Sequence, residues 1–199
     1  PPDWQDKISI YPGLNNPLSA HWYCVDWDGN VYVVAEHFAS GKDIDFHAEA
    51  IKRISRRLGW KTDGRDRLYA LIDSAAGQRT LASAKSVAEL FYERGIVADT
   101  KVNKDVFTGI ARVKSYLCGG NGCGNIYIFS DCVNMIDEFM RYAWGEGDSP
   151  VKKDDHCMDE LRYYLMSRPQ PAEREQPPLA PIAADKQRRI RNKRRSVAD

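Results

Sequence analysis

Asp73 is the first acidic residue whose position suits metal-dependent chemistry. It ends the apolar segment 67–73 and is followed by four small residues, Ser-Ala-Ala-Gly. Small residues let a ligand or a backbone approach a carboxylate closely. An Asp at a strand end also caps a following helix well, because its side chain accepts hydrogen bonds from free backbone N–H groups. The sequence therefore leaves two roles open for Asp73, metal ligand or helix cap.

A second acidic group lies in segment 154–164, Asp-Asp-His-Cys-Met-Asp-Glu-Leu-Arg-Tyr-Tyr. In a helix, Asp155, Asp159 and Arg162 would share one face, with His156 beside Asp159. Carboxylates four residues apart repel each other unless a cation neutralises them, and a divalent metal ion is one such cation. The alternative is that the leading acids favour the positive helix N-terminus while Arg162 pairs with Asp159.

Carboxylates that converge from separate elements suit phosphodiester hydrolysis. Oxygen ligands are preferred by Mg²⁺ and Mn²⁺. In the two-ion mechanism the ions lie about 4 Å apart, where one activates water and the other stabilises the leaving oxygen. We expect such ligands to come from rigid elements that meet at one edge of a sheet.

The elements that must position these acids follow from hydrophobic periodicity and turn residues. Asp-Gly-Asn at 28–30 is a hairpin turn between two strands. The predicted strands are 7–11, 20–27, 31–38, 67–73, 96–102 and 125–129. The predicted helices are 44–58, 87–94, 104–117, 132–144 and about 154–166. This order predicts an α/β fold with a mixed sheet, in which three antiparallel strands are followed by parallel strands and helices cover both faces.

Charge divides the chain into a body and a tail. Residues 168–199 hold nine Lys or Arg and four Asp or Glu, which leaves 20 basic and 24 acidic residues in 1–167. A mildly acidic body is unlike a protein that coats DNA with a basic face. We predict one domain over 1–167, and a Pro-rich linker with a disordered basic tail over 168–199.

Other features of the sequence concern its compartment and completeness. Five cysteines without a secreted-scaffold spacing predict reduced thiols and a cytosolic location. The Cys118–Cys123 pair lacks the second pair that a zinc site needs. The apolar runs are too short to span a bilayer. The start at Pro1, without Met or a signal pattern, suggests a fragment of a longer chain.

Three motifs in order resemble the C-terminal nuclease domain of tailed-phage terminase large subunits. Segment 154–164 is similar to the closing motif of that family. Ala-Leu-Ile-Asp-Ser-Ala-Ala at 70–76 looks like its second acidic strand. Ile-Ser-Ile-Tyr-Pro-Gly-Leu-Asn-Asn-Pro at 8–17, with the hairpin at 28–33 and Glu36, looks like its first hairpin. The resemblance covers roughly residues 5–168.

The resemblance implies an RNase H-like endonuclease that cuts concatemeric double-stranded phage DNA with little sequence preference, using two Mg²⁺ or Mn²⁺ ions. Carried over by position, Asp73 and Asp155 would be metal ligands. Asp159 and His156 would be ligand or proton-handling groups. The implied partners are the portal protein, the small terminase subunit and an ATPase domain, and the implied location is the host-cell cytoplasm. No Gly-x-x-x-x-Gly-Lys-Ser/Thr phosphate loop occurs in these 199 residues.

One residue departs from the family pattern. The family has Asp at the end of the first strand, where a carboxylate bridges metal ions before Pro-Gly, and here that position is Tyr11. A neutral phenol cannot replace a bridging carboxylate at pH 7. We therefore expect reduced or absent cleavage, with Glu36 or Asp26 on neighbouring strands as the candidates for compensation.

Binding of duplex DNA without sequence readout needs cations beside the phosphate backbone. The candidate DNA-binding residues are Arg79, Lys85, Lys101, Lys104 and Arg112; ordinary solvated surface side chains are the alternative. Two other functions stay open. A non-catalytic module that docks DNA or the portal is favoured by Tyr11, and a resolvase-like or transposase-like nuclease would share the fold and metals.

Overall fold

A computed structural model of the chain describes residues 1–13, 16–79, 84–119, 124–147 and 149–173. Its core is a six-stranded sheet in the order β5-β4-β1-β2-β3-β6. The strands are β1 (Gln5–Tyr11), β2 (Leu18–Val25), β3 (Val31–Ala39), β4 (Leu68–Ile72), β5 (Ile96–Asp99) and β6 (Ile126–Ile128). The first three form an antiparallel meander, and β4, β5 and β6 join it by parallel pairing. The mixed sheet predicted from the sequence is confirmed.

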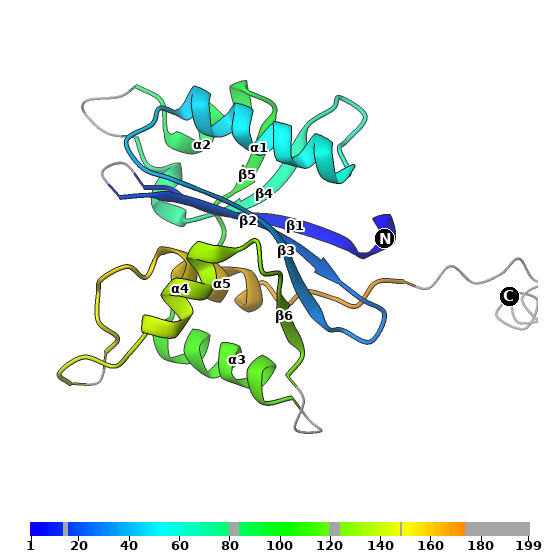
Figure 1. Ribbon diagram of the computed structural model, residues 1–199. Helices are drawn as coiled ribbons and strands as arrows, with labels where there is room; N and C mark the ends of the chain where they lie inside the picture. Colours follow the sequence, from blue (N-terminus) through cyan, green and yellow to red (C-terminus); the bar gives the residue numbers. More distant parts are fainter. Residues whose placement is uncertain (14–15, 80–83, 120–123, 148, 174–199) are drawn as a thin grey trace, which may run out of the picture.

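Five helices cover the two faces of this sheet (Figure 1). They are α1 (Ile44–Leu58), α2 (Val87–Glu93), α3 (Val106–Cys118), α4 (Val133–Arg141) and α5 (His156–Met166). Helices α1 and α2 lie on one face, and α3, α4 and α5 lie on the other. Because successive strand residues point to opposite faces, Trp22 packs in the core beneath α1 and its neighbour Tyr23 packs beneath α5.

Local sequence signals explain where the helices begin and end. Helix α1 starts after Asp43, whose side chain accepts a hydrogen bond from the Phe46 N–H, and it stops at Gly59 in the left-handed conformation. Its bounds match the prediction. Helix α5 begins at His156, two residues later than predicted, because Asp155 occupies the N-cap position with a non-helical backbone. The predicted strand 96–102 stops at Asp99, where the Lys101 N–H turns back to the Asp99 side chain.

The residues after α5 follow the body for a short distance. The backbone N–H of Ala172 donates a hydrogen bond to the carbonyl of Asp26, at the turn between β2 and β3. The rest of the predicted basic tail, and Cys123 of the cysteine pair, lie outside the described residues. Among the described helices, none is long and apolar enough to cross a membrane.

Candidate active site

Parallel pairing of β1 and β4 brings Tyr11 and Asp73 together. Ile10 pairs with Ile72 in the register of the two strands. The residues that follow them, Tyr11 and Asp73, therefore lie side by side at the same edge of the sheet. The backbone N–H of Asp73 donates to the carbonyl of Ile10 at 3.3 Å. The Asp73 side chain accepts from the Ala75 N–H at 2.7 Å, so it also caps the short 3-10 turn Ser74–Gly77. Capping occupies one of its two carboxylate oxygens.

Helix α5 and its N-cap residue supply two further acids to the site. Asp155 and Asp159 are 7% and 4% exposed, and the Asp159 N–H donates to the Asp155 carbonyl at 2.8 Å. Arg162 forms a buried ion pair with Asp159, as the alternative reading of this segment predicted. A second contact from Arg162, to the carbonyl of Asp105, ties α5 to the start of α3. These contacts fix the orientation of the Asp159 carboxylate.

Gly109 lets α3 approach this ion pair closely. A Cβ atom at Gly109 would lie 3.2 Å from both Cδ and Nη1 of Arg162. Glycine within a helix interior costs stability relative to Ala, so its presence here has a packing reason. The side chain of Arg162 occupies the space that a larger residue would need.

The three acids converge on the phenol of Tyr11. Burial raises the pKa of Tyr11 to about 12, and the negative charges of Asp159, Asp73 and Asp155 add to this effect. Burial also raises the pKa of Tyr163, together with the charges of Asp159 and Asp73. The structure therefore brings the acids of β4 and of α5 into one site, centred on the position where the family pattern has Asp.

His156 borders the same site. Its ring centroid lies 5.4 Å from that of Tyr11, and its Nδ1 atom is buried with no hydrogen-bond partner among the described residues. A ring nitrogen without a partner is free to accept or donate a proton within the site. The predicted group Asp73, Asp155, His156 and Asp159 is thus assembled in space, although the chemical role of each residue stays a prediction.

Two lysines contribute positive charge to this acidic site. The ammonium group of Lys104 lies 2.9 Å from each carboxylate oxygen of Asp73. Lys152 lies 3.4 Å from Asp155 and 3.6 Å from Asp159. Burial opposes ionisation of Asp73, but the Ala75 N–H, Lys104 and the Tyr163 hydroxyl outweigh it and lower the pKa of Asp73. The acid is therefore held in its charged form.

These donors fit a divalent cation. The carboxylates are hard oxygen ligands on the end of a strand and the start of a helix, as Mg²⁺ and Mn²⁺ prefer. One buried oxygen, Oδ2 of Asp155, accepts no hydrogen bond from the described residues, and its charge is offset by the exposed Lys152 ammonium 3.4 Å away, which a divalent ion could replace. The three aspartates do not, however, bring their oxygens within 4.8 Å of one another, as a preformed cluster would. The lysines lie among them.

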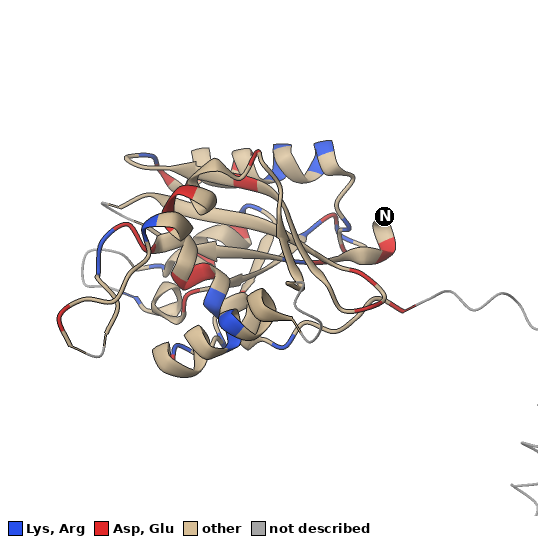
Figure 2. Ribbon diagram, turned by 60° about the horizontal axis from the view of Figure 1, so that its bottom comes forward, with Lys and Arg blue, Asp and Glu red and all other residues tan. Residues whose placement is uncertain are grey.

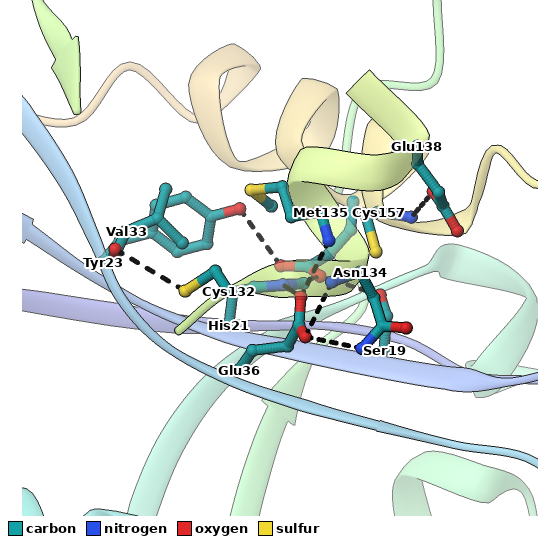
Figure 3. A network of polar contacts seen from close by, with 11 residues as sticks. Ser19, His21, Tyr23, Val33, Glu36, Cys132, Asn134, Met135, Glu138 and Cys157 are labelled. Atoms are coloured by element: carbon teal, nitrogen blue, oxygen red, sulfur yellow. Dashed lines mark hydrogen bonds and ion pairs between the residues drawn. The ribbon is translucent and has the colours of Figure 1, made fainter. Parts of the chain in front are cut away.

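A second buried polar cluster lies on the same face of the sheet (Figure 3). Ser19, His21 and Tyr23 alternate along β2, so all three point toward α5. Each contacts the Glu160 carboxylate, with Ser19 Oγ at 2.8 Å, His21 Nδ1 at 2.5 Å and the Tyr23 hydroxyl at 3.2 Å. His21 Nε2 also lies 3.0 Å from the carboxylate of Glu36. The imidazole is therefore held between two carboxylates.

This cluster positions the helices that frame the acidic site. Glu160 follows Asp159 directly in α5. Glu36 accepts hydrogen bonds from the backbone N–H groups of Asn134 and Met135, at the start of α4. Glu138 of α4 accepts in turn from the Cys157 N–H of α5. The sequence signal for this network is the alternation of polar side chains along a central strand, at Ser19, His21 and Tyr23.

His21, Glu36 and Cys157 bring potential ligand atoms within 4.8 Å of one another, and they could hold a metal ion only after His21 and Cys157 each lose a proton. Burial lowers the pKa of His21, yet Glu160 and Glu36 outweigh it and raise the pKa to about 9. Both ring nitrogens then carry protons, whereas a metal needs a free lone pair. Burial also raises the pKa of the Cys157 thiol, which keeps it neutral. The cluster is an ion-pair network.

Neither candidate for compensating Tyr11 reaches the acidic site. Glu36 is committed to His21 and to the start of α4. Asp26 accepts hydrogen bonds from the turn at 28–30 and from Tyr32. Strand register puts Asp26 at the far end of the meander, because Tyr11 pairs with Ser19 while Gln5 pairs with Cys24. Compensation by either acid is excluded by this placement.

The predicted DNA-binding cations separate into distinct environments. Lys104 belongs to the acidic site, whereas Arg79 and Lys85 form exposed ion pairs with Glu89 and Glu93 of α2. Lys101 is exposed, and Arg112 lies over the Tyr116 ring at 5.4 Å. Figure 2 shows basic and acidic segments interspersed over the body. A single basic track along this body is therefore not formed by the five residues.

The same arrangement of strands and helices occurs in solved structures of large terminases. The P22 large terminase nuclease domain superposes with a TM-score of 0.67 and 17% identity, over 84% of this chain and 83% of that domain. The SPP1 nuclease domain, solved with bound Mn, gives a TM-score of 0.54 and 16% identity over 79% and 84% of the two chains. The chain has the fold of a large-terminase nuclease domain. The α/β fold with a mixed sheet, expected from the sequence, is confirmed.

The likeness extends to a longer terminase. The large terminase of the thermophilic bacteriophage D6E matches with a TM-score of 0.65 and 22% identity over 83% of this chain. The chain spans 40% of the length of that protein. No protein-family model and no curated protein matches the sequence. The likeness to the terminase nuclease fold is thus a likeness of structure.

Proposed function

We propose that this chain is the DNA-cleaving domain of a phage packaging terminase, and that its cofactor is a divalent cation bound in the site that Asp73, Asp155 and Asp159 form. One observation carries the proposal. In a terminase nuclease fold, buried carboxylates at the end of β4 and at the start of α5 lie close enough to Tyr11 for their charges to raise the pKa of its phenol. These carboxylates are separated by more than 80 residues in sequence, and the fold brings them to one site.

The cofactor would be Mg²⁺ or Mn²⁺, with two ions as the full complement of this type of nuclease. Such ions lower the pKa of water and neutralise the charge that develops on the leaving oxygen. Arg162 would hold the Asp159 carboxylate in its ligand orientation through their buried ion pair. The unpartnered Nδ1 of His156 would accept or return a proton beside the scissile phosphate.

Tyr11 would limit cleavage. Its pKa of about 12 keeps the phenol neutral at physiological pH, so it supplies no bridging negative charge. Its ring also fills space between His156 and Tyr163, with centroid separations of 5.4 Å and 6.4 Å. We therefore propose an impaired nuclease, whose remaining ligands bind metal more weakly than a site with Asp at this position.

The substrate would be concatemeric double-stranded phage DNA, cut with little sequence preference. A protein spanning the full length of a large terminase would add an ATPase domain, and would meet the portal protein and the small terminase subunit in the host cytoplasm. Arg79, Lys85 and Lys104 would contact phosphate groups only where their carboxylate partners release them.

Nicking of supercoiled plasmid in Mn²⁺ tests the proposal. Asp73→Asn and Asp155→Asn should each abolish the slow nicking expected of the unmodified chain. Asp131→Asn, a change of one exposed acid, should not alter it. Cleavage that survives both active-site changes would refute the proposed site.

The same assay separates the nuclease from a non-catalytic docking module, which Tyr11 and the Lys104–Asp73 pair favour. A docking module would give no nicking with any variant, including Tyr11→Asp. It would still retard duplex DNA in a gel. Selective cutting of branched junctions over linear duplex would instead indicate a resolvase-like enzyme.

A further inference from the structure

Lys104 makes the closest contact that any cation makes with the Asp73 carboxylate. Its ammonium lies 2.9 Å from both Oδ1 and Oδ2, which is the separation of a charge-assisted hydrogen bond. The same ammonium lies 5.9 Å from the centre of the Tyr163 ring. Asp73 is 5% exposed, so its charge is poorly screened by water. The Lys104 side chain is 45% exposed, so what distinguishes the pair is its geometry, with one ammonium on both oxygens of a buried carboxylate.

The loop that carries Lys104 is anchored on both sides. The next residue, Asp105, caps α3 by accepting from the Thr108 N–H at 2.7 Å, and its own N–H donates to Asn103 Oδ1 at 2.9 Å. Arg162 of α5 contacts the Asp105 carbonyl. The backbone beside Lys104 is thus fixed by the same arginine that orients Asp159.

Lys152 differs from Lys104 mainly in distance, because both lysines are exposed, Lys104 to 45% of its side chain. Lys152 approaches Asp155 and Asp159 only to 3.4 Å and 3.6 Å, and its side chain is 64% exposed. Contacts of this kind contribute little and are easily exchanged. Oδ2 of Asp155 accepts no hydrogen bond from the described residues. The α5 side of the site can therefore accept a divalent ion in place of Lys152.

We propose that Lys104 is a built-in cation that occupies Asp73 in place of one divalent ion, so that the site takes a single ion on the side of Asp155 and Asp159. This inference rests on the proposed metal-dependent function. Two features of the chain support each other here. Tyr11 stands where a carboxylate would bridge two ions. Lys104 neutralises the neighbouring Asp73, which would otherwise need a divalent ion to balance its charge.

The net charge of the site also favours a single divalent ion. Asp73, Asp155 and Asp159 carry three negative charges, and Lys104, Lys152 and Arg162 supply three positive charges. Exchange of Lys152 for one divalent ion leaves a net charge of +1 in this group. A second divalent ion beside Lys104 would raise that to +3 in a partly buried site, which Coulomb repulsion opposes.

Titration with Mn²⁺ tests this inference without relying on cleavage. Electron paramagnetic resonance measures the concentration of free Mn²⁺, and calorimetry measures the heat of binding. The proteins compared are the unmodified chain, Lys104→Gln, Lys104→Arg and Lys52→Gln. Lys52 is a matched charge control, since it pairs with Glu49 on α1, on the opposite face of the sheet. The thermal midpoint of each variant without metal shows that the fold is retained.

The inference predicts one bound ion for the unmodified chain and for Lys104→Arg and Lys52→Gln. Lys104→Gln should bind a second ion, or bind its one ion roughly tenfold more tightly, because a unit charge close to a divalent ion has been removed. Two ions in the unmodified chain, or Lys104→Gln indistinguishable from Lys52→Gln, would overturn the role of Lys104 and leave the proposed nuclease standing. Absence of Mn²⁺ binding that depends on Asp155 would instead overturn the proposed function itself.

Discussion

Tyr11 and Asp73 lie side by side at the ends of the parallel strands β1 and β4, and the Asp73 N–H donates to the residue before Tyr11. This adjacency puts a neutral phenol where a metal-bridging carboxylate would be most effective. It also exposes that phenol to the negative charge of three aspartates. The chemistry of the site therefore depends on what residue 11 contributes.

Replacing Tyr11 with Asp should raise Mn²⁺-dependent plasmid nicking by more than about tenfold, because a restored carboxylate strengthens ion binding and transition-state charge stabilisation. Tyr11→Phe should leave the rate unchanged, since the phenol supplies no charge. Without metal, Tyr11→Asp should lower the thermal midpoint by adding like charge, and Mn²⁺ should restore it. Equal and robust nicking by the unmodified chain and Tyr11→Asp would show that the phenol does not impair the site.

Replacing His21 with Ala should cost about 3–5 kcal/mol in the free energy of unfolding, because it leaves two buried carboxylates without their shared cation. His21 is fully buried between Glu160 and Glu36. Lys52→Ala breaks a surface pair with Glu49 and should change stability by less than about 1 kcal/mol. Urea unfolding monitored by fluorescence measures both. A loss for His21→Ala as small as that for Lys52→Ala would contradict the network's role.

Stability should fall at alkaline pH through His21. Its pKa is raised from 6.5 in the unfolded chain to about 9 in the fold, so the folded state binds the extra proton. This contribution is complete below pH 6.5 and is lost as the pH rises through about 9. Glu36, whose pKa is lowered from 4.5 to about 2, contributes fully above pH 4.5 and loses its contribution as the pH falls through about 2.

Unfolding free energies measured from pH 4 to 10 check this dependence. The decline in unfolding free energy between pH 6.5 and about 9 should vanish in His21→Ala, while declines caused by other groups persist. Tyr23 and Cys157 also face the network, and burial raises their pKa values, so each stays neutral in the fold and lowers stability only when its unfolded form ionises, near its ordinary pKa of 10.0 or 9.0. An identical pH profile for the two proteins would show that His21 is not the titrating group.

Gly109→Ala should destabilise the protein by about 1 kcal/mol. Helix propensity favours Ala by about 1 kcal/mol, but the new Cβ lies 3.2 Å from Arg162, which its ion pair with Asp159 prevents from moving freely. Overpacking of this kind costs about 1–3 kcal/mol. Gly64→Ala, where nothing lies within 4 Å, should be neutral or slightly stabilising. Stabilisation of Gly109→Ala would show that Arg162 yields readily.

The sequence was sufficient for the sheet and for the two acidic segments because their signals are local. Apolar periodicity marked each strand and helix, and the turn at 28–30 set the first hairpin. Convergence of Asp73 with Asp155 was expected from the resemblance to terminase nuclease domains, because no local signal places the start of α5 beside the end of β4. Carboxylates at element ends were thus a sound guide to where a site would form.

The sequence was less informative wherever a residue's role depends on its partner across the fold. Lys104 looked like a phosphate-binding cation because its pairing with Asp73 spans 31 residues. Glu160 is surrounded by three side chains of β2 at sequence separations of 137 to 141. The polar alternation along β2 marks one side of this pairing, but nothing local identifies Glu160 as the partner.

A crystal soaked in Mn²⁺ and examined by anomalous scattering tests the central claim most directly. The account predicts an anomalous peak in contact with the carboxylates of Asp155 and Asp159, displacing Lys152, with Lys104 still on Asp73. A soaked crystal that shows no peak at these aspartates, or that shows its ion at His21 and Glu36, would contradict this prediction.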